Sequence, residues 1–157
     1  MNFIKLDKSQ KDSVLQYLYE ILYSNMSKIV PMNNSYDDWM SRVSPALEKE
    51  QRQILLICDG DKIVGFFQYF FNNGLFMMEE IQLCDPYKGS GAFRELYAYL
   101  TGIIPENTEL VEAYADKVNH KSIEILTHLG LEIIGEDESF YHFRGRYENI
   151  LRKYGKK

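Results

Sequence analysis

The stretch that decides the fold is "DPYKGSGAFREL", residues 85–96. An apolar stripe at helical spacing follows its glycines and consists of Phe93, Leu96, Tyr97 and Leu100. The preceding residues 75–83, "LFMMEEIQL", are typical of a β-strand. A glycine turn between a strand and a helix leaves backbone N–H groups unpaired at the positive end of the helix dipole, where proteins hold phosphate. An ordinary flexible turn would have the same composition, so the rest of the chain must decide between the two.

Length and composition indicate one globular domain covering residues 1–157. Hydrophobic residues make up 45% of the chain and charged residues 26%, which is typical of a folded protein. The formal net charge is −5, opposite in sign to that of most nucleic-acid binders, and it suits a cationic or amine-bearing partner. Because residues 1–10 lack an apolar signal region and no run is long enough to cross a bilayer, we expect a cytoplasmic protein without a membrane partner.

The cysteines and histidines do not form a metal-binding pattern. Cys58 and Cys84 lie far apart, and the three histidines, His120, His128 and His142, are scattered without ligand spacing. We therefore predict no bound metal, and two free thiols in a reducing compartment.

The predicted element order is β-α-α-β-β-β-α-β-α-β-β, followed by a basic terminal helix over residues 146–157. Asp-Gly at residues 59–60 and Asn-Gly at residues 73–74 predict two hairpin turns that connect three antiparallel strands. Ser9 with Asp12 predicts a capping box at the start of the first helix, and either Ser35 or Asp37 the start of the second. This order excludes an all-β sandwich and a regular βαβ alternation.

The segment "NHKSIEILTHLGLEIIGE", residues 119–136, is the second informative stretch. Asn119 is a good N-cap, and Gly130 is well placed to end the helix. With the glycine loop of residues 88–93, it resembles the two characteristic motifs of the GCN5-related N-acetyltransferases, the GNAT family. The family's loop has the pattern Gln/Arg-x-x-Gly-x-Gly/Ala, and its later helix begins with Asn and ends in Leu-Gly-Phe.

The resemblance implies a mixed α/β fold over residues 1–157. Its centre would be a twisted, mostly antiparallel sheet of about seven strands flanked by helices, with the fourth and fifth strands splayed apart. The pantetheine arm of acetyl-CoA would lie between these two strands. The cofactor-binding residues that the resemblance implies are Leu83, Cys84, Asp85, Lys88, Gly89, Ser90, Gly91, Ala92, Phe93 and Asn119.

Three positions differ from the family pattern. Lys88 replaces Gln/Arg, which keeps the charge but loses the planar donor fork. Phe93 replaces Gly/Ala, and its place on the apolar stripe favours a core role over contact with the pyrophosphate. Leu126 stands where the family often has the tyrosine that protonates the departing thiolate, so the source of this proton is open. A Rossmann loop is excluded because its third glycine would be Arg94.

The carboxylates Glu79 and Glu80 are the catalytic candidates. They immediately precede the glycine loop and point to opposite faces of a regular strand, so at most one of them faces the substrate. We prefer Glu80 as the base that deprotonates the attacking amine, although a β-bulge would favour Glu79. Either residue is alternatively an ordinary solvent-facing side chain. Cys84 is expected to pack beside the pantetheine arm, since direct transfer needs no covalent intermediate.

Two functions remain open from the sequence. The first is an N-acetyltransferase that transfers the acetyl group of acetyl-CoA to a primary amine of a small molecule or a protein, as a monomer or homodimer. The second is a non-catalytic acyl-CoA-binding protein of the same fold, acting as a sensor or partner subunit. Leu126 favours the second function, whereas the retained loop and the two nearby carboxylates favour the first.

Overall fold

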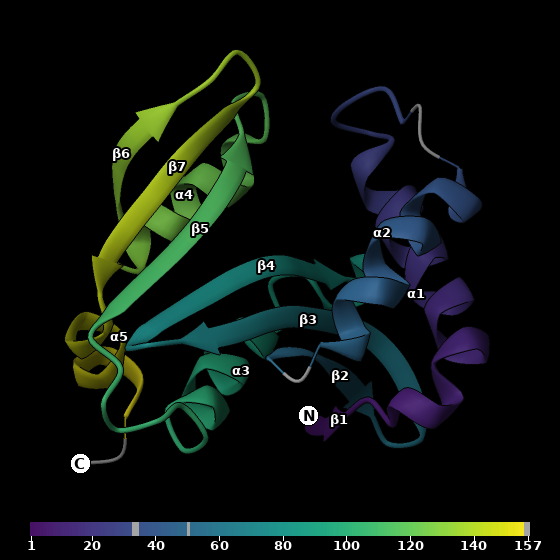
Figure 1. Ribbon diagram of the computed structural model, residues 1–157, viewed down its shortest axis with the longest axis horizontal. Coiled ribbons are helices and arrows are strands. Elements are labelled where there is room, and N and C mark those ends of the chain that lie inside the picture. Colours follow the sequence, from purple (N-terminus) through teal and green to yellow (C-terminus); the bar gives the residue numbers. More distant parts are fainter. Residues whose placement is uncertain (33–34, 50, 156–157) are drawn as a thin grey trace. The chain divides into compact units, whose positions relative to one another are not determined.

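The computed structural model describes residues 1–32, 35–49 and 51–155 (Figure 1). Its strands are β1 (Asn2–Lys5), β2 (Arg52–Asp59), β3 (Lys62–Asn72), β4 (Leu75–Leu83), β5 (Leu110–Asp116), β6 (Glu132–Glu136) and β7 (Phe140–Arg146). The α-helices are α1 (Lys11–Met26), α2 (Tyr36–Glu48), α3 (Ala92–Leu100), α4 (His120–His128) and α5 (Tyr147–Tyr154). Every element predicted from the sequence is present in the described part of the chain; residues 156–157 of the predicted terminal helix lie outside it.

The strands form one seven-stranded sheet in the order β1-β2-β3-β4-β5-β7-β6. β4 and β5 are parallel, and helix α3 makes the crossover between them. The pairs β1–β2, β5–β7 and β6–β7 are antiparallel, and tight two-residue turns join β2 to β3 and β3 to β4. The predicted fold class, a mostly antiparallel sheet of about seven strands flanked by helices, is confirmed.

The chain divides into two compact units. The first comprises residues 1–69 and 80–92, and the second comprises residues 70–79 and 93–157. Strands β3 and β4 and helix α3 each pass from one unit into the other.

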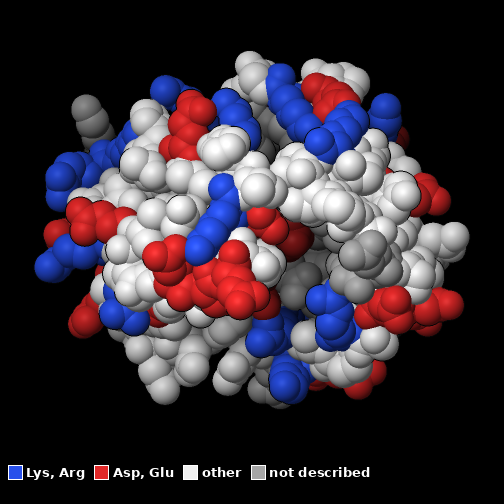
Figure 2. Space-filling model, turned by 90° about the horizontal axis from the view of Figure 1, so that it is seen from above, with Lys and Arg blue, Asp and Glu red and all other residues white. Residues whose placement is uncertain are grey.

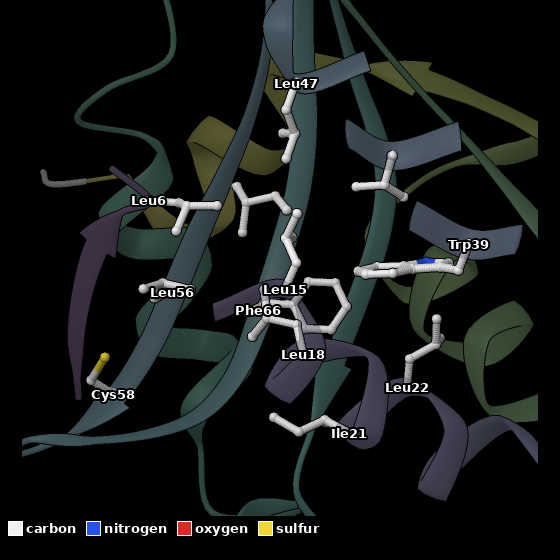
Figure 3. Packing of buried hydrophobic residues seen from close by; sticks show 12 residues of the cluster. Leu6, Leu15, Leu18, Ile21, Leu22, Trp39, Leu47, Leu56, Cys58 and Phe66 are labelled. Carbon is white, nitrogen blue, oxygen red and sulfur yellow. The ribbon is translucent and has the colours of Figure 1, made fainter. Parts of the chain in front are cut away.

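The core of the first unit lies between α1, α2 and one face of β2 (Figure 3). Alternate residues of β2 face the helices, because successive side chains of a strand point to opposite sides. These are Ile54, Leu56 and Cys58, and they pack with Phe66 of β3. The helices contribute the stripes that their sequence predicts, with Leu15, Leu18, Ile21 and Leu22 from α1 and Trp39, Val43 and Leu47 from α2.

The second unit is built around the β5–β7 ladder, with α4 packed against β5. Its buried residues come from α3, β5, α4, β7 and α5 and include Leu96, Leu100, Val111, Ala113, Leu126, Phe143 and Ile150. Tyr97 of α3 and Tyr154 of α5 hold the two helices together, with ring centroids 5.4 Å apart. Phe93, expected on the buried stripe of α3, is half-buried.

Local sequence signals set most element ends correctly. Asn73 (φ 47°) and Gly74 (φ 83°) both have positive φ, as a type I′ hairpin turn requires. Ser35 caps α2 in a capping box with Asp38, which settles the choice between Ser35 and Asp37. The capping box predicted for α1 is wrong: the Ser9 hydroxyl donates to Asp7 Oδ1 at 2.7 Å and forms a turn ahead of the helix.

A search of the described residues found no helix that is long and apolar enough to cross a membrane.

Candidate functional site

The loop between β4 and α3 has the backbone conformation of an anion cradle. A single 3-10 turn at Asp85–Tyr87 follows β4, and α3 begins at Ala92. Gly89 (φ 76°) and Gly91 (φ 87°) adopt left-handed conformations that side chains disfavour. Left-handed glycines directly ahead of a helix favour anion binding, because they leave backbone N–H groups near the positive end of the helix dipole. The Ser90 N–H is already engaged and donates to the Tyr87 carbonyl at 3.2 Å. A Cβ added at either glycine would meet no atom within 4 Å, so the loop opens to solvent.

Lys88, expected to face the pyrophosphate, is held by the protein itself. Its ammonium lies 2.7 Å from Asp85 Oδ1 and donates to Asn25 Oδ1 at 3.1 Å. Lys28 approaches the other oxygen of Asp85 at 2.6 Å. Two lysines therefore converge on one half-exposed carboxylate at the start of the glycine loop.

Asp85 should titrate far below an ordinary carboxyl. Hydrogen bonds from Lys28 and Lys88 lower the pKa of Asp85 to about 2. Because the folded pKa lies below the unfolded value of about 3.9, these contacts stabilise the fold above pH about 4 and are lost as the pH falls toward 2. An NMR titration of the Asp85 carboxyl should show this low midpoint, and Lys28→Met should raise it. A wild-type midpoint near 4 would contradict the pairing.

Asn25 connects this loop to the candidate base. Its amide nitrogen donates at 2.9 Å to both Gln82 Oε1 and the Leu83 carbonyl oxygen. The Gln82 nitrogen in turn donates to Glu80 Oε1 at 2.6 Å. Asn25 and Gln82 are each only 7% exposed. Glu80 thus lies on the same side of β4 as α1, at the end of a chain of hydrogen bonds that begins at Lys88.

Glu79 and Glu80 are both half-buried, and they belong to different compact units. Both carboxylates have interactions within the protein, so neither is an isolated surface charge. Glu80 is joined to the glycine loop through Gln82, Asn25 and Lys88.

The backbone at residues 83–85 is partly engaged. The Cys84 N–H donates to the Val64 carbonyl at 2.8 Å, and the Leu83 carbonyl accepts from Asn25. The Cys84 side chain is half-buried and its pKa is raised, chiefly by burial, which disfavours the reactive thiolate. Both Cys84 and Cys58 are free thiols.

Asn119 caps α4 as predicted. Its Oδ1 accepts from the Ser122 N–H at 3.2 Å. At the other end, Gly130 has φ 91°, and the Leu131 N–H donates to the Leu126 carbonyl at 3.1 Å, which is the 6→1 bond of a Schellman motif. The Leu126 side chain is buried and carries no proton to donate, so α4 supplies no acid at this position.

The β4–β5 ladder ends before either strand does. Its four pairs run from Leu75↔Leu110 to Met78↔Ala113. β4 continues to Leu83 and β5 to Asp116, so the strands extend past their last shared pair. The candidate carboxylates and residues 83–85 all follow this point in the chain.

A buried ionic cluster in the second unit was not foreseen from the sequence. The Glu112 side chain, 8% exposed, contacts the His142 ring and lies 3.5 Å from the Arg144 guanidinium. Tyr114 stacks on His142 with ring centroids 4.3 Å apart. Only a strand register could have revealed the cluster, because β5 and β7 place Glu112 opposite Arg144 and Tyr114 opposite His142.

Charge is distributed in mixed fashion outside these clusters. Figure 2 shows Lys and Arg side chains interspersed with Asp and Glu over the face seen from above. Lys117 pairs with Glu136 at 2.6 Å and lies over the Tyr141 ring. Among the described residues, no group of His, Cys, Asp and Glu could hold a metal ion.

Comparisons with known proteins bear on the fold. No protein-family model and no curated protein matches the sequence. Solved structures match over nearly the whole chain. The PaiA N-acetyltransferase from Thermoplasma acidophilum, in complex with coenzyme A, is 11% identical with a TM-score of 0.73, covering 93% of this chain and 98% of its own.

Two further structures give the same result. The spermidine N-acetyltransferase from Vibrio cholerae, in complex with CoA and spermine, is 12% identical with a TM-score of 0.68 and covers 96% of this chain and 97% of its own. A putative acetyltransferase of the GNAT family from Desulfovibrio desulfuricans is 13% identical with a TM-score of 0.72. It covers 92% of this chain and 98% of its own. The chain therefore has the fold of the GCN5-related N-acetyltransferases, as its glycine loop and its Asn-capped helix predicted.

Proposed function

We propose that this protein is an N-acetyltransferase that transfers the acetyl group of acetyl-CoA to a primary amine of a small molecule or a protein. The observation that carries the proposal is the Lys88–Ala92 loop, with two left-handed glycines ahead of α3. Open space at both glycines, directly ahead of a helix N-terminus, suits a pyrophosphate. The fold is shared with acetyltransferases solved with coenzyme A, one of them also with spermine, which supports an amine acceptor.

The cofactor would be held by the residues that the sequence indicated. Gly89, Gly91 and the first turn of α3, with Ala92 and Phe93, would offer backbone donors to the pyrophosphate. The Ser90 N–H already donates to the Tyr87 carbonyl at 3.2 Å, so Ser90 would contribute through its place in the loop. Leu83, Cys84 and Asp85 would line the pantetheine arm. Asn119 is the remaining cofactor-binding candidate, and it fixes the start of α4. The Cys84 N–H already binds Val64. The N–H that polarises the thioester carbonyl must therefore come from a neighbouring residue.

The chemical step is direct. The amine nitrogen forms a bond to the thioester carbonyl carbon, the C–S bond breaks, and its electron pair leaves with sulfur. An amine of ordinary pKa, about 10.4, is mostly protonated at neutral pH. Glu80, or Glu79 in its place, accepts the proton that the nitrogen must lose. The free thiols of Cys58 and Cys84 favour a reducing, cytoplasmic location.

A non-catalytic acyl-CoA-binding role is the alternative, favoured by the leucine at position 126. The two roles differ in whether free thiol is released. A panel of diamines, polyamines, aminoglycosides and lysine peptides should be incubated with acetyl-CoA and assayed for free CoA. Release with at least one amine is expected; acetyl-CoA binding without release for the whole panel would favour the binding role.

A tyrosine that acts as a general acid toward the departing thiolate should contribute little to the rate of transfer. The Tyr87 hydroxyl donates to Asp59 Oδ2 at 2.8 Å, and this bond raises the pKa of Tyr87. Tyr114 is the other candidate by sequence, and it stacks on His142. A CoA thiol with a pKa near 8.5 can leave as the anion. Tyr87→Phe and Tyr114→Phe should each slow turnover less than about tenfold, or about 1.4 kcal/mol. A loss of about a thousandfold in either variant, with acetyl-CoA binding intact, would identify a tyrosine acid.

A further inference from the structure

Asn25 occupies a position where the sequence pattern of α1 calls for an apolar residue. Leu15, Leu18 and Leu22 form the buried stripe of this helix, and residue 25 continues it at the same spacing. An amide buried there costs free energy unless each of its polar atoms is hydrogen-bonded. A leucine would extend the core at no such cost, so the asparagine calls for an explanation beyond packing.

All polar atoms of Asn25 are satisfied, and each by a residue near the candidate site. Its oxygen accepts from Lys88, and its nitrogen donates to Gln82 and to the Leu83 carbonyl. In the described part of the chain, no buried side-chain nitrogen or oxygen lacks a partner. Asn25 is 63 residues from Lys88 and 57 from Gln82 in sequence, so tertiary structure alone brings them together.

Three hydrogen bonds form a series in which every donor-to-acceptor direction points the same way. Lys88 donates to Asn25, Asn25 donates to Gln82, and Gln82 donates to Glu80. The series begins at an ammonium in the cofactor loop and ends at a carboxylate on β4. The charged ends fix which way each amide faces, because reversing either one would oppose two donors or two acceptors. Hydrogen bonds aligned in this way strengthen one another.

β4 is held firmly at the middle of this series. A Cβ at Gly65 of β3 would lie 2.4 Å from the Gln82 carbonyl oxygen, so only glycine lets the two strands approach this closely. The neighbouring Cys84 N–H donates to Val64 on the same strand. The Gln82 side chain therefore extends from a backbone that cannot shift to accommodate a lost partner.

We propose that Asn25 is a positioning residue, which through Gln82 holds the candidate base Glu80 in place and couples it to Lys88 of the cofactor loop. Asn25 does not touch the reacting atoms in this account. It fixes the Gln82 amide, and Gln82 fixes the carboxylate that accepts the amine proton. The proposal rests on the proposed acetyltransferase function, and it adds a residue of α1 that the glycine-loop and Asn-helix motifs do not contain.

The test is a double-mutant cycle between Asn25→Leu and Glu80→Gln. Asn25→Leu should lower kcat about tenfold when Glu80 is present, since about 1.4 kcal/mol lies within the range of coupling between contacting residues. In the Glu80→Gln background the same change should lower kcat less than about twofold. Equal losses in both backgrounds, or no loss in either, would overturn the proposal. Gln16→Leu, an exposed amide on the same helix, is the matched control and should leave kcat unchanged.

A second measurement needs neither cofactor nor turnover. In the ligand-free protein, the Gln82 side-chain amide protons should exchange slowly with solvent by NMR, and Asn25→Leu should accelerate their exchange. Unchanged exchange would overturn the coupling. If Asn25→Leu does not fold, Gln82→Met removes the amide that contacts Glu80 directly, and it replaces Asn25→Leu in the double-mutant cycle with Glu80→Gln. Failure of the proposed function is distinguishable, because wild-type protein would then release no CoA with any amine of the panel, whether or not it binds acetyl-CoA; that result would overturn the role of Asn25 in transfer.

Discussion

Gly91→Glu should abolish acetyl-CoA binding. Gly91 has φ 87°, a conformation that costs a residue with a side chain about 1–2 kcal/mol. The new carboxylate would also stand beside the N–H groups that are proposed to hold the pyrophosphate, and it would repel that anion. Isothermal titration calorimetry should show no acetyl-CoA binding at concentrations that saturate the wild type.

Gly60→Glu is the matched control for this variant. Gly60 also has positive φ, at 60°, and a Cβ there likewise meets no atom within 4 Å. It lies in the β2–β3 turn, where the neighbouring Asp59 accepts from the Tyr87 hydroxyl, so the same strain and charge are added close to the glycine loop but outside the N–H groups proposed to bind the pyrophosphate. Its acetyl-CoA affinity should equal that of the wild type. Binding by Gly91→Glu at near wild-type affinity would contradict the pyrophosphate role of the loop.

Glu80→Gln should lower kcat/KM by roughly 10²–10⁴-fold, the usual share of general base catalysis. The glutamine keeps the shape of the side chain, and its oxygen can still accept from Gln82 Nε2, so the local structure should persist. Only the ability to accept a proton at neutral pH is lost. Acetyl-CoA affinity should remain close to that of the wild type, which would separate the loss of chemistry from a loss of binding.

Glu79→Gln is the informative comparison for this variant. It removes the same charge one residue earlier in β4, from a side chain on the opposite face of a regular strand, and it should cost much less. A larger loss for Glu79→Gln than for Glu80→Gln would assign the base to Glu79. Glu124→Gln, on helix α4, should leave the rate unchanged and controls for the general effect of one lost charge.

Features fixed by neighbouring residues were predictable from the sequence. The Asn73–Gly74 turn, the Asn119 cap and the Gly130 helix end each depend on one or two residues with strong backbone preferences. The strand–glycine loop–helix order at residues 75–100 likewise follows from local spacing. These elements in their order sufficed to predict the fold, although the identity to its structural neighbours is only 11–13%.

Features that depend on distant residues were not predictable. The sequence suggested that Lys88 would face a phosphate, but not that Asp85 and Asn25 would hold it. The Glu112–His142 contact depends on the β5–β7 register, and a bulge in β6 moves Gly135, not Ile134, opposite His142. Such contacts arise from strand register and helix packing, which local propensities do not determine. The acceptor site also remained beyond prediction, because no sequence motif marks it.

Calorimetric comparison of acetyl-CoA with NAD and ATP tests the central claim most directly. If the Lys88–Ala92 loop holds the pyrophosphate of acetyl-CoA, binding should be in the micromolar range, about −8 kcal/mol. NAD and ATP also carry pyrophosphates but have no pantetheine arm, and they should bind much more weakly. Acetyl-CoA binding that is lost in Gly91→Glu and retained in Gly60→Glu is the predicted result. NAD binding as tight as that of acetyl-CoA, or tighter, would contradict it.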